Sequence, residues 1–556
     1  MPSNVTLLLT LLLTVAVEAE ASALLSETLP ALSGKVSSAE EGPMEGVLVS
    51  ARRDGSTITI TVVSDAEGRF SFPPDRLGSG KHALGIRAVG YDLVGPDVVE
   101  IAAGMAATVD LKLRKSEDLA SQLSNGEWLA SVPGSEQQKS SLLGCLGCHT
   151  LERVMRSRHN ADDFMQVLAR MHGYVNQSIP EAPQLRRAER LMEERGDQRV
   201  VVNRGLADYL SAINLGTRSE WDYELKTLPR PKGEATRVVV TEYKLPRTTI
   251  QPHDVIVDAD GIAWFSSFGE QMLGRLDPKT GEVDEYPMPL PKPGFPTGSL
   301  GLRSDREGNL WLGMMYQGAI AEFDRKAATF RVWPLPAEVN IDAAQVNMVS
   351  PQSSGVDGKV WTQNNGFAGI HRLDLASGAI ETFLPFNSAP KGEPHNIYDV
   401  IPDSHNNAYF TDFRQRHIGR IDAETGEVRF YATPTPGSAP RRGMMDAQDR
   451  LWFAEFRGNR IAMLETKSGR ISEWPIATPW SAPYDVALDK DGTAWAGSMS
   501  TDRVLRLDPE NGRIVEYLLP RETNIRRVFV DNSSRPIAFW VGNNHRASII
   551  KLEPLD

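Results

Sequence analysis

The 556-residue sequence predicts a mainly β, multidomain protein with a small β-sandwich, a small all-α domain and a seven-bladed β-propeller, in that order. Residues 31–115 consist of short β-branched or aromatic runs that Gly and Pro separate. From residue 116 to residue 230 the apolar positions follow helical spacing. From residue 236 to residue 556 an aromatic-centred unit recurs every 43 to 50 residues, which is typical of a propeller.

The N-terminal part is expected to form a sandwich because its strand-like runs are short and regularly spaced. These runs are Val47–Val49, Thr57–Val63 and Phe70–Phe72. The segment resembles the carboxypeptidase regulatory-like domain in Gly34-x-Val36, Gly46-Val47, Ser64-Asp65-Ala66-Glu67-Gly68-Arg69-Phe70 and Ala88-Val89-Gly90-Tyr91. The resemblance implies a seven-stranded sandwich without catalytic residues, which serves as a structural or docking module.

The middle part is expected to be helical. One apolar face follows the i, i+3, i+4, i+7 spacing at Phe164, Val167, Leu168 and Met171, and either Asn160 or Asp162 could cap the start of that helix. A second face repeats the spacing at Leu206, Tyr209, Leu210 and Ile213. These two faces predict a small helical domain between the sandwich and the repeats.

The repeats are marked by an aromatic residue after a Gly or Asn turn, at Trp264, Trp311, Trp361, Tyr409, Trp452, Trp495 and Trp540. Each marker is followed by a strand that ends in an acidic residue, and then usually by a Gly turn and an outer strand. The last repeat ends without its outer strand, whereas Val238–Pro246 supplies an unpaired copy at the front. We therefore expect this first strand to complete the last blade and close the ring, which covers the open sheet edges.

The chain has only two cysteines, and both lie in Cys145-Leu146-Gly147-Cys148-His149. A c-type haem needs two thiols that add to its vinyl groups and an adjacent imidazole that binds iron, and this motif supplies all three. A disulfide and a zinc site are the alternatives, but no second cysteine pair exists to complete tetrahedral zinc coordination. The histidine directly after the second cysteine favours one covalent haem c on Cys145 and Cys148.

The segment from Cys145 to about Leu215, within a domain predicted at residues 116–230, resembles a small class I cytochrome c domain. Its closing helix would contain residues 206–210. The resemblance implies that His149 is the proximal ligand of the haem iron and that a methionine is distal. Met171 is the expected distal ligand because it shares the apolar face of its helix. The alternatives are Met192, His172 and His159.

The repeats resemble the virginiamycin B (streptogramin) lyase family in elements such as residues 258–265 and 451–461. That resemblance implies a channel site where a Glu-x-His pair and a further histidine, together with Mg²⁺, open a cyclic depsipeptide by proton abstraction and elimination. Glu393-Pro394-His395 is similar to the pair, and His253 stands in the first repeat. The repeat directly before His395 offers no histidine at the matching place.

Five polar residues occupy or flank the Pro-x position that opens a repeat: His253, Glu393, His395, Arg441 and Tyr484. Since equivalent positions of a propeller converge on its axis, we expect these side chains to meet at one channel mouth. Such a mouth could bind an anionic or divalent-metal-linked ligand, with His395 and Glu393 as catalytic groups. Polar residues that merely cap neighbouring strands are the alternative.

Composition and the N-terminus indicate where the protein works. The net charge of −12 argues against nucleic-acid binding, which needs a basic face. An 11-residue apolar run, Leu7–Val17, precedes two A-x-A sites and predicts a signal peptide over residues 1–23, although an uncleaved surface anchor is the alternative. No later stretch is long enough for a transmembrane helix. A periplasmic or secreted location follows.

Three functions fit these features. The first is an exported haem protein for electron transfer, whose propeller binds a periplasmic redox partner or a small-molecule substrate. The second is a lyase-like enzyme acting on a cyclic ester or depsipeptide, and the third is a non-catalytic binding platform. The sequence has no nicotinamide fingerprint and no quinone-forming crosslink, so any oxidation beyond the haem would need another centre.

Overall fold

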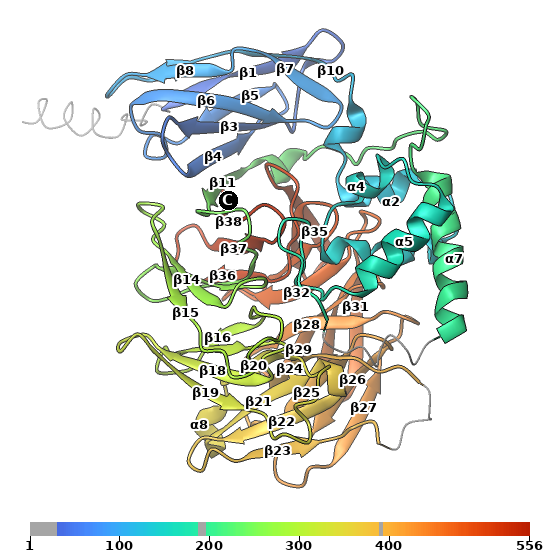
Figure 1. Cartoon of the computed structure of the whole chain (residues 1–556). Helices are drawn as coiled ribbons and strands as arrows, with labels where there is room; N and C mark the ends of the chain where they lie inside the picture. Colours follow the sequence, from blue (N-terminus) through green and yellow to red (C-terminus); the bar gives the residue numbers. More distant parts are fainter. Residues whose placement is uncertain (1–30, 187–195, 388–392, 556) are drawn as a thin grey trace, which may run out of the picture.

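The computed structural model of the chain describes residues 31–186, 196–387 and 393–555. A small β-sandwich lies at one end, a body of radiating sheets at the other, and a group of helices packs beside that body (Figure 1). The predicted signal peptide, residues 1–23, lies outside the described residues. None of the described helices is long and apolar enough to cross a membrane. The predicted mainly β class is confirmed.

The sandwich consists of β1 (Leu32–Ser38), β2 (Gly42–Pro43), β3 (Leu48–Arg53), β4 (Ile58–Val63), β5 (Arg69–Phe72), β6 (Gly80–Arg87), β7 (Tyr91–Gly95), β8 (Val98–Ile101), β9 (Ala107–Thr108) and β10 (Leu111–Lys115). One sheet has the order β2-β1-β10-β7, with β5 and β9 also paired to β1, and the other contains β4-β3-β6-β8. These ten strands exceed the expected seven because short pairings such as β2 and β9 are added along β1. Leu32, Val36 and Phe72 are fully buried between the sheets.

The helical part consists of η1 (Leu119–Gln122), α2 (Asn125–Ser131), α3 (Glu136–Leu142), η2 (Cys145–Gly147), α4 (Leu151–Met155), α5 (Ala161–His172), α7 (Gly196–Ile213) and η3 (Gly233–Thr236). Both predicted helices are present, as α5 and α7. Asn160 is the cap of α5, because its side chain accepts a 2.9 Å hydrogen bond from the backbone N–H of Asp163. Trp128, Leu146 and Met155 are fully buried in the core of this part.

The propeller body contains six four-stranded antiparallel sheets. Among the described residues, the first sheet contains β12 (Pro252–Val257), β13 (Ala263–Ser267), β14 (Met272–Leu276) and β15 (Val283–Pro287), and the second contains β16 (Leu302–Ser304), β17 (Leu310–Gly313), β18 (Ala319–Asp324) and β19 (Thr329–Pro334). The third contains β20 (Val346–Ser350), β21 (Lys359–Asn364), β22 (Gly369–Asp374) and β23 (Ile380–Phe383), and the fourth contains β24 (Ile397–Pro402), β25 (Ala408–Asp412), β26 (His417–Ile421) and β27 (Val428–Ala432). The fifth contains β28 (Pro440–Met445), β29 (Arg450–Glu455), β30 (Arg460–Glu465) and β31 (Arg470–Pro475), and the sixth contains β32 (Pro483–Leu488), β33 (Ala494–Ser498), β34 (Arg503–Asp508) and β35 (Arg513–Leu518). Two short helices, α8 (Ser354–Asp357) and η4 (Asn365–Phe367), interrupt the third sheet.

A further set of four strands follows them: β36 (Phe529–Asp531), β37 (Ala538–Asn543), β38 (Ser548–Pro554) and, from the front of the body, β11 (Val238–Lys244). The innermost strands contact one another in the cycle β12-β16-β20-β24-β28-β32-β36, and β36 contacts β12 again. The sheets therefore surround a common axis as a closed ring.

The repeated Asp-to-Trp spacing has a local physical cause. Asp258 accepts hydrogen bonds from the backbone N–H groups of the turn with one carboxylate oxygen, and from Trp264 Nε1 at 2.8 Å with the other. The same indole bond, six residues apart, joins Trp311 to Asp305 and Trp495 to Asp489. Each carboxylate thus ties the turn to the ring that packs between neighbouring sheets.

Strand β11 joins three parts of the chain. It pairs antiparallel with β38 over seven residues, from Val238 opposite Pro554 to Lys244 opposite Ser548. The expected pairing of this front strand with the last repeat is confirmed. Its other edge pairs with β4 of the sandwich, so that one sheet runs through β36-β37-β38-β11-β4-β3-β6-β8. The sandwich covers the edge that ring closure alone would leave open.

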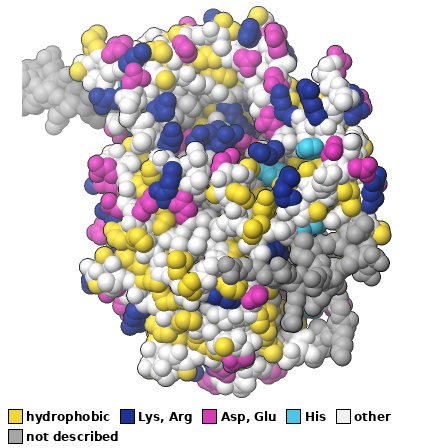
Figure 2. Space-filling model, viewed as in Figure 1, with side chains coloured by type: hydrophobic (Ala, Val, Ile, Leu, Met, Phe, Trp, Pro, Cys, Tyr) yellow, Lys and Arg dark blue, Asp and Glu magenta, His cyan; other side chains and the backbone are white. Residues whose placement is uncertain are grey.

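Buried ion pairs reinforce the junction. Arg87 of the sandwich donates to Asp502 at 2.6 Å and to the backbone oxygen of Leu519 at 2.8 Å. Arg76 binds Glu553 with two hydrogen bonds of 2.9 and 3.0 Å. Figure 2 shows Lys and Arg side chains gathered where the sandwich meets the rest of the molecule. The sandwich is consequently anchored to the last sheet by backbone and by charge.

We predict that Thr241→Pro lowers stability by at least about 2 kcal/mol, because proline removes a backbone donor from a strand that is paired on both edges. Thr241→Val is the matched control. The Thr241 hydroxyl is buried without a hydrogen-bond partner among the described residues, so valine should keep or raise stability. Thermal unfolding measures both, and equal midpoints for the two variants would contradict the role of β11.

Candidate functional site

The channel side chains come from irregularities in the innermost strands. In five sheets the pairing register shifts across two residues, as between Pro252 and Val255 or between Pro483 and Val486. A bulge of this kind re-aims side chains, and here the two freed residues face the axis. The first freed residue and its equivalents form the mouth ring: His253, Leu300, Asn347, Tyr398, Arg441, Tyr484 and Arg526. The next residues form the inner ring: Asp254, Gly301, Met348, Asp399, Arg442, Asp485 and Arg527.

A directional hydrogen-bond chain crosses the mouth ring. Arg441 Nη2 donates a hydrogen bond of 3.2 Å to the Tyr398 hydroxyl, and that hydroxyl is hydrogen-bonded to the hydroxyl of Tyr484. The Tyr484 hydroxyl lies 3.4 Å from His253 Nε2, whereas His253 Nδ1 lies 2.8 Å from a carboxylate oxygen of Asp254. Because the carboxylate only accepts, Nδ1 carries the proton and Nε2 accepts. Burial lowers the pKa of His253 to about 3, so the ring is neutral.

Arg441 is surrounded by aromatic rings. Its guanidinium carbon lies 3.6 Å from the ring centre of Tyr484, 4.5 Å from Phe456, and 4.6 Å from both Phe413 and Tyr398. Its Nε is buried without a hydrogen-bond partner among the described residues. The mouth ring therefore holds a buried cation that its aromatic neighbours stabilise through their π-faces and through one hydrogen bond to a tyrosine hydroxyl.

The inner ring is charge-balanced. Arg442 binds Asp254 with two hydrogen bonds of 2.7 and 2.9 Å, and Arg303, which enters beside this ring, binds Asp399 with 2.8 and 3.0 Å. Asp485 is the less well-paired member, since Arg527 Nε lies 3.9 Å from its carboxylate. Burial raises the pKa of Asp485 to about 6, although Arg442 and Arg527 oppose the shift.

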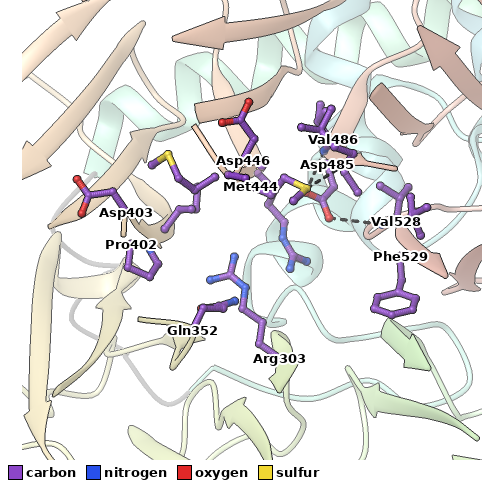
Figure 3. Close-up of a pocket in the computed structure, with 18 of the residues that line it drawn as sticks. Arg303, Gln352, Pro402, Asp403, Met444, Asp446, Asp485, Val486, Val528 and Phe529 are labelled. Atoms are coloured by element: carbon purple, nitrogen blue, oxygen red, sulfur yellow. Dashed lines mark hydrogen bonds between the residues drawn. The ribbon is translucent and has the colours of Figure 1, made fainter. Parts of the chain in front are cut away.

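The far ends of the same strands enclose an open cavity of about 420 Å³. Figure 3 shows Arg303 pointing into its centre, with Pro402 and Asp403 on one side and Val528 and Phe529 on the other. Asp485 reaches the cavity from the inner ring. The channel thus has two ends, a mouth ring next to the helical part and an open cavity opposite.

The predicted haem-attachment segment lies against the mouth end. Asn524 Nδ2 donates to the backbone oxygen of Leu146 at 3.1 Å, and Arg526 Nη2 donates to that of Gly147 at 2.7 Å. Arg526 also lies with its guanidinium carbon 4.7 Å from the ring of Phe268, which is a neighbour of His253. The helical part is therefore held onto the channel by residues of the last sheet.

The residues of the motif fit a covalent haem in their chemistry. Both cysteines are free thiols, and burial raises the pKa of Cys145 to about 11, which disfavours a thiolate metal ligand. His149 Nδ1 lies 2.9 Å from the backbone oxygen of Thr150. That bond fixes the tautomer in which Nε2 is the nitrogen that can bind iron.

The distal-ligand candidates are placed as follows. Met171 is half-buried in the last turn of α5, and no described contact joins it to His149. His172 contacts Asn203 of α7 at 3.5 Å, and His159 packs edge-on against Phe164. Met192 lies outside the described residues. Met171 as distal ligand stays a prediction.

The structure brings His253, Arg441 and Tyr484 together but not Glu393 and His395. His395 Nδ1 lies 2.6 Å from Asp412 and its ring stacks on Phe386 at 3.8 Å. Glu393 is half-exposed, 3.8 Å from His395. No described contact joins either residue to the other three. Among the described residues, no group of three or more His, Cys, Asp and Glu is arranged to hold a metal ion; Mg²⁺ binding stays a prediction.

Tyr398, not His395, occupies the mouth-ring position of the fourth sheet, because Val400 pairs with Phe410 as Val255 pairs with Phe265. Sequence reasoning missed Tyr398 and Arg526. The sequence does contain a signal for Tyr398. In several repeats the mouth-ring residue stands eleven positions before the aromatic marker, and Tyr398 stands eleven positions before Tyr409, whereas His395 stands fourteen positions before it. For Arg526 that spacing fails because the last repeat carries a longer turn.

The comparisons match the two ends of the chain. The carboxypeptidase regulatory-like domain matches residues 31–114, and the virginiamycin B lyase family matches residues 397–554. These matches support both resemblances, so the protein combines a regulatory-like sandwich with a lyase-like propeller fold. The comparisons give no evidence for a class I cytochrome c domain at residues 116–230. No curated protein matches the chain.

Several solved structures are similar to the propeller. Selenomethionine-substituted virginiamycin B lyase from Staphylococcus aureus is 23% identical, covers 57% of this chain and 100% of its own, and has a TM-score of 0.49. A streptogramin B lyase structure is also 23% identical, with 58% and 99% covered and a TM-score of 0.49. A catalytically inactive virginiamycin B lyase from Staphylococcus aureus with quinupristin is 22% identical, with 57% and 100% covered and a TM-score of 0.48.

We predict that Asp485→Asn makes the protein more stable at pH 7, by up to roughly 3 kcal/mol, and that this gain shrinks towards pH 4. The sign follows from the raised pKa. The folded protein favours the protonated form of Asp485. Protonation of Asp485 therefore contributes fully to the stability of the fold below the unfolded pKa near 4, and this contribution is lost as the pH rises through about 6.

Asp254→Asn is the matched control for this prediction, because the pKa of Asp254 is held well below its ordinary value by Arg442 and Arg527 against the opposing effect of burial. It should destabilise the protein at pH 7. Urea unfolding between pH 4 and pH 7.5 measures both variants. A pH-independent difference between Asp485→Asn and the wild type would contradict the assigned titration.

Proposed function

We propose that this protein is an exported haem c protein whose seven sheets form a seven-bladed propeller, and whose mouth ring binds the small molecule or partner with which the haem exchanges electrons. The periplasm or the extracellular space is the expected location. The observation that carries the proposal is the attachment of the Cys145–His149 segment to the mouth ring by Asn524 and Arg526.

The arrangement supports the proposal in a physical way. Arg526 belongs to the mouth ring and at the same time binds the backbone between the two cysteines. Arg526 is close enough to Cys148 to lower the pKa of its thiol, although the larger effect of burial raises that pKa. A group attached to Cys148 would therefore be bound close to this arginine. The ligand site and the redox group would then lie next to each other instead of on opposite sides of the molecule.

Cys145 and Cys148 would attach the haem and His149 would bind its iron. Bound haem c supplies one-electron transfer. The residues of the chain do the rest: Thr150 orients His149, buried Leu146 anchors the loop, and Asn524 and Arg526 fix the loop on the propeller. Met171 is the proposed distal ligand.

We predict that the wild-type protein, produced in a host with c-haem maturation, keeps its haem on the polypeptide in a denaturing gel and after acid-acetone extraction. Cys148→Ser should lose most of the haem stain, because one of the two thioether bonds cannot form. Ser141→Ala, four residues before Cys145, is the control and should stain normally. Haem that leaves the wild-type chain completely in acid acetone would refute the proposal.

A lyase-like function is the second candidate, and the family match over residues 397–554 favours it. A base in the mouth ring would remove a proton next to the ester, the C–O bond would break, and a double bond and a carboxylic acid would form. His253, oriented by Asp254, is the imidazole at the right place. However, a base with a pKa of about 3 matches proton abstraction near neutral pH poorly, which ranks this candidate second.

The lyase candidate predicts that purified protein with Mg²⁺ converts quinupristin into a linear isomer of the same mass, which chromatography and fragmentation detect. His253→Gln should abolish this conversion, whereas His395→Gln should leave it nearly unchanged because His395 contacts Asp412 and Phe386 instead of the mouth ring. Unaltered quinupristin after prolonged incubation with the wild type would eliminate this candidate for that substrate.

A further inference from the structure

We propose that the mouth ring is a carboxylate-binding site, with Arg441 and Arg526 as the binding cations. The inference deepens the proposed function, because the carboxylate has two sources: a propionate of a haem attached at Cys145 and Cys148, or a small-molecule carboxylate that enters the mouth. Both sources present the same planar, singly charged group to the two arginines.

Arg441 is a buried cation with few polar partners. Its side chain is nine-tenths buried, yet its described polar contacts are one hydrogen bond to the Tyr398 hydroxyl and a 3.9 Å contact to Met499 Sδ. Its Nε has no partner, and no carboxylate lies within ion-pair distance among the residues that the structure describes. A guanidinium has five donors, and leaving several unsatisfied in a buried place costs free energy. An anion would satisfy them.

Arg526 supplies the second cation on the same ring. It is 4% exposed and donates to Asn524 and to the backbone oxygen of Gly147, both of which are uncharged acceptors. Burial lowers its pKa, and the nearby Arg441 lowers it further. Two buried guanidinium groups close enough to repel each other mark a place that a negative charge would stabilise.

The inner ring, one residue further along each strand, shows the contrast. There Arg442 and Arg527 face Asp254, and Arg303 faces Asp399, so each cation has a carboxylate built into the propeller. The inner-ring arginines are therefore neutralised by carboxylates of the propeller itself, namely Asp254 and Asp399. The described part of the mouth ring provides two arginines, two tyrosines and a neutral histidine instead.

The surroundings select the class of anion. The fork of a guanidinium matches the two oxygens of a carboxylate in one plane. The walls are flat aromatic rings, namely Tyr398, Tyr484, Phe413, Phe456 and Phe268. Such walls suit a planar carboxylate on an apolar body better than a strongly hydrated phosphate. The tyrosine hydroxyls add polar contacts that fix its orientation.

The test uses the full-length protein as purified and succinate as the probe. Arg441→Gln removes the charge, Arg441→Lys keeps it, and Arg429→Gln is the matched control, an exposed arginine on β27 whose guanidinium carbon lies 5.1 Å from the ring centre of Tyr431. If the site takes a free carboxylate, calorimetry should show succinate binding that Arg441→Gln weakens at least about tenfold. Arg441→Lys should weaken it less, and Arg429→Gln should leave it unchanged.

The second arm measures the haem. If a propionate occupies the site, Arg441→Gln should lower the midpoint potential, because a positive charge stabilises the reduced haem. It should also shift the carboxylate bands of the oxidised-minus-reduced infrared spectrum. Arg429→Gln should do neither. Arg441→Met, which fills the same aromatic pocket, replaces Arg441→Gln if the latter does not fold.

The two failures are distinguishable. A chain that carries no covalent haem overturns the proposed function, and the succinate arm then decides the carboxylate site alone. The inference is overturned when Arg441→Gln and Arg429→Gln agree in succinate affinity and, where haem is present, in potential and infrared bands.

Discussion

The pairing of β11 with β38 on one edge and β4 on the other is the constraint on which the rest of the structure depends. It completes the last sheet of the ring, and the same strand carries the sheet onward into the sandwich. A ring of sheets encloses an axis only when it closes, so the channel and both of its ends exist because this strand returns from the front of the chain. The sandwich also covers an edge that could otherwise pair with another chain.

The closed ring turns a local backbone irregularity into a site. A bulge in one strand re-aims two side chains, but seven equivalent positions around an axis make two stacked rings of side chains. The inner ring neutralises itself through pairs such as Arg442 with Asp254. The mouth ring keeps a hydrogen-bond chain that ends on His253, and it keeps arginines whose described partners are neutral. The charge-balanced inner ring and the proposed ligand site are thus one residue apart along each strand.

The helical part gives the mouth ring its chemical context. Arg526 binds the loop between Cys145 and Cys148. Gly126 of α2 approaches the turn between β33 and β34 so closely that an added Cβ would lie 2.5 Å from Thr501 Cγ2. Such close packing requires glycine and sets the distance between the helices and the channel. A redox group on the cysteines and a ligand in the mouth ring would therefore contact some of the same side chains, which would place them close enough to exchange electrons.

The sequence alone determined the order of the parts, the strand that closes the ring and the helices α5 and α7, because periodicity, turn residues and the Asp-to-Trp spacing are local signals. It also singled out Cys145, Cys148 and His149, whose chemistry lies in adjacent residues. Only the tertiary structure decided which residues meet on the axis. Tyr398 replaced His395 because the register of β24 against β25, not proximity to a proline, aims the side chain. Arg526 departs from the usual marker spacing, and the pairing of β11 with β4 had no local signal, since it joins segments that are far apart in the sequence.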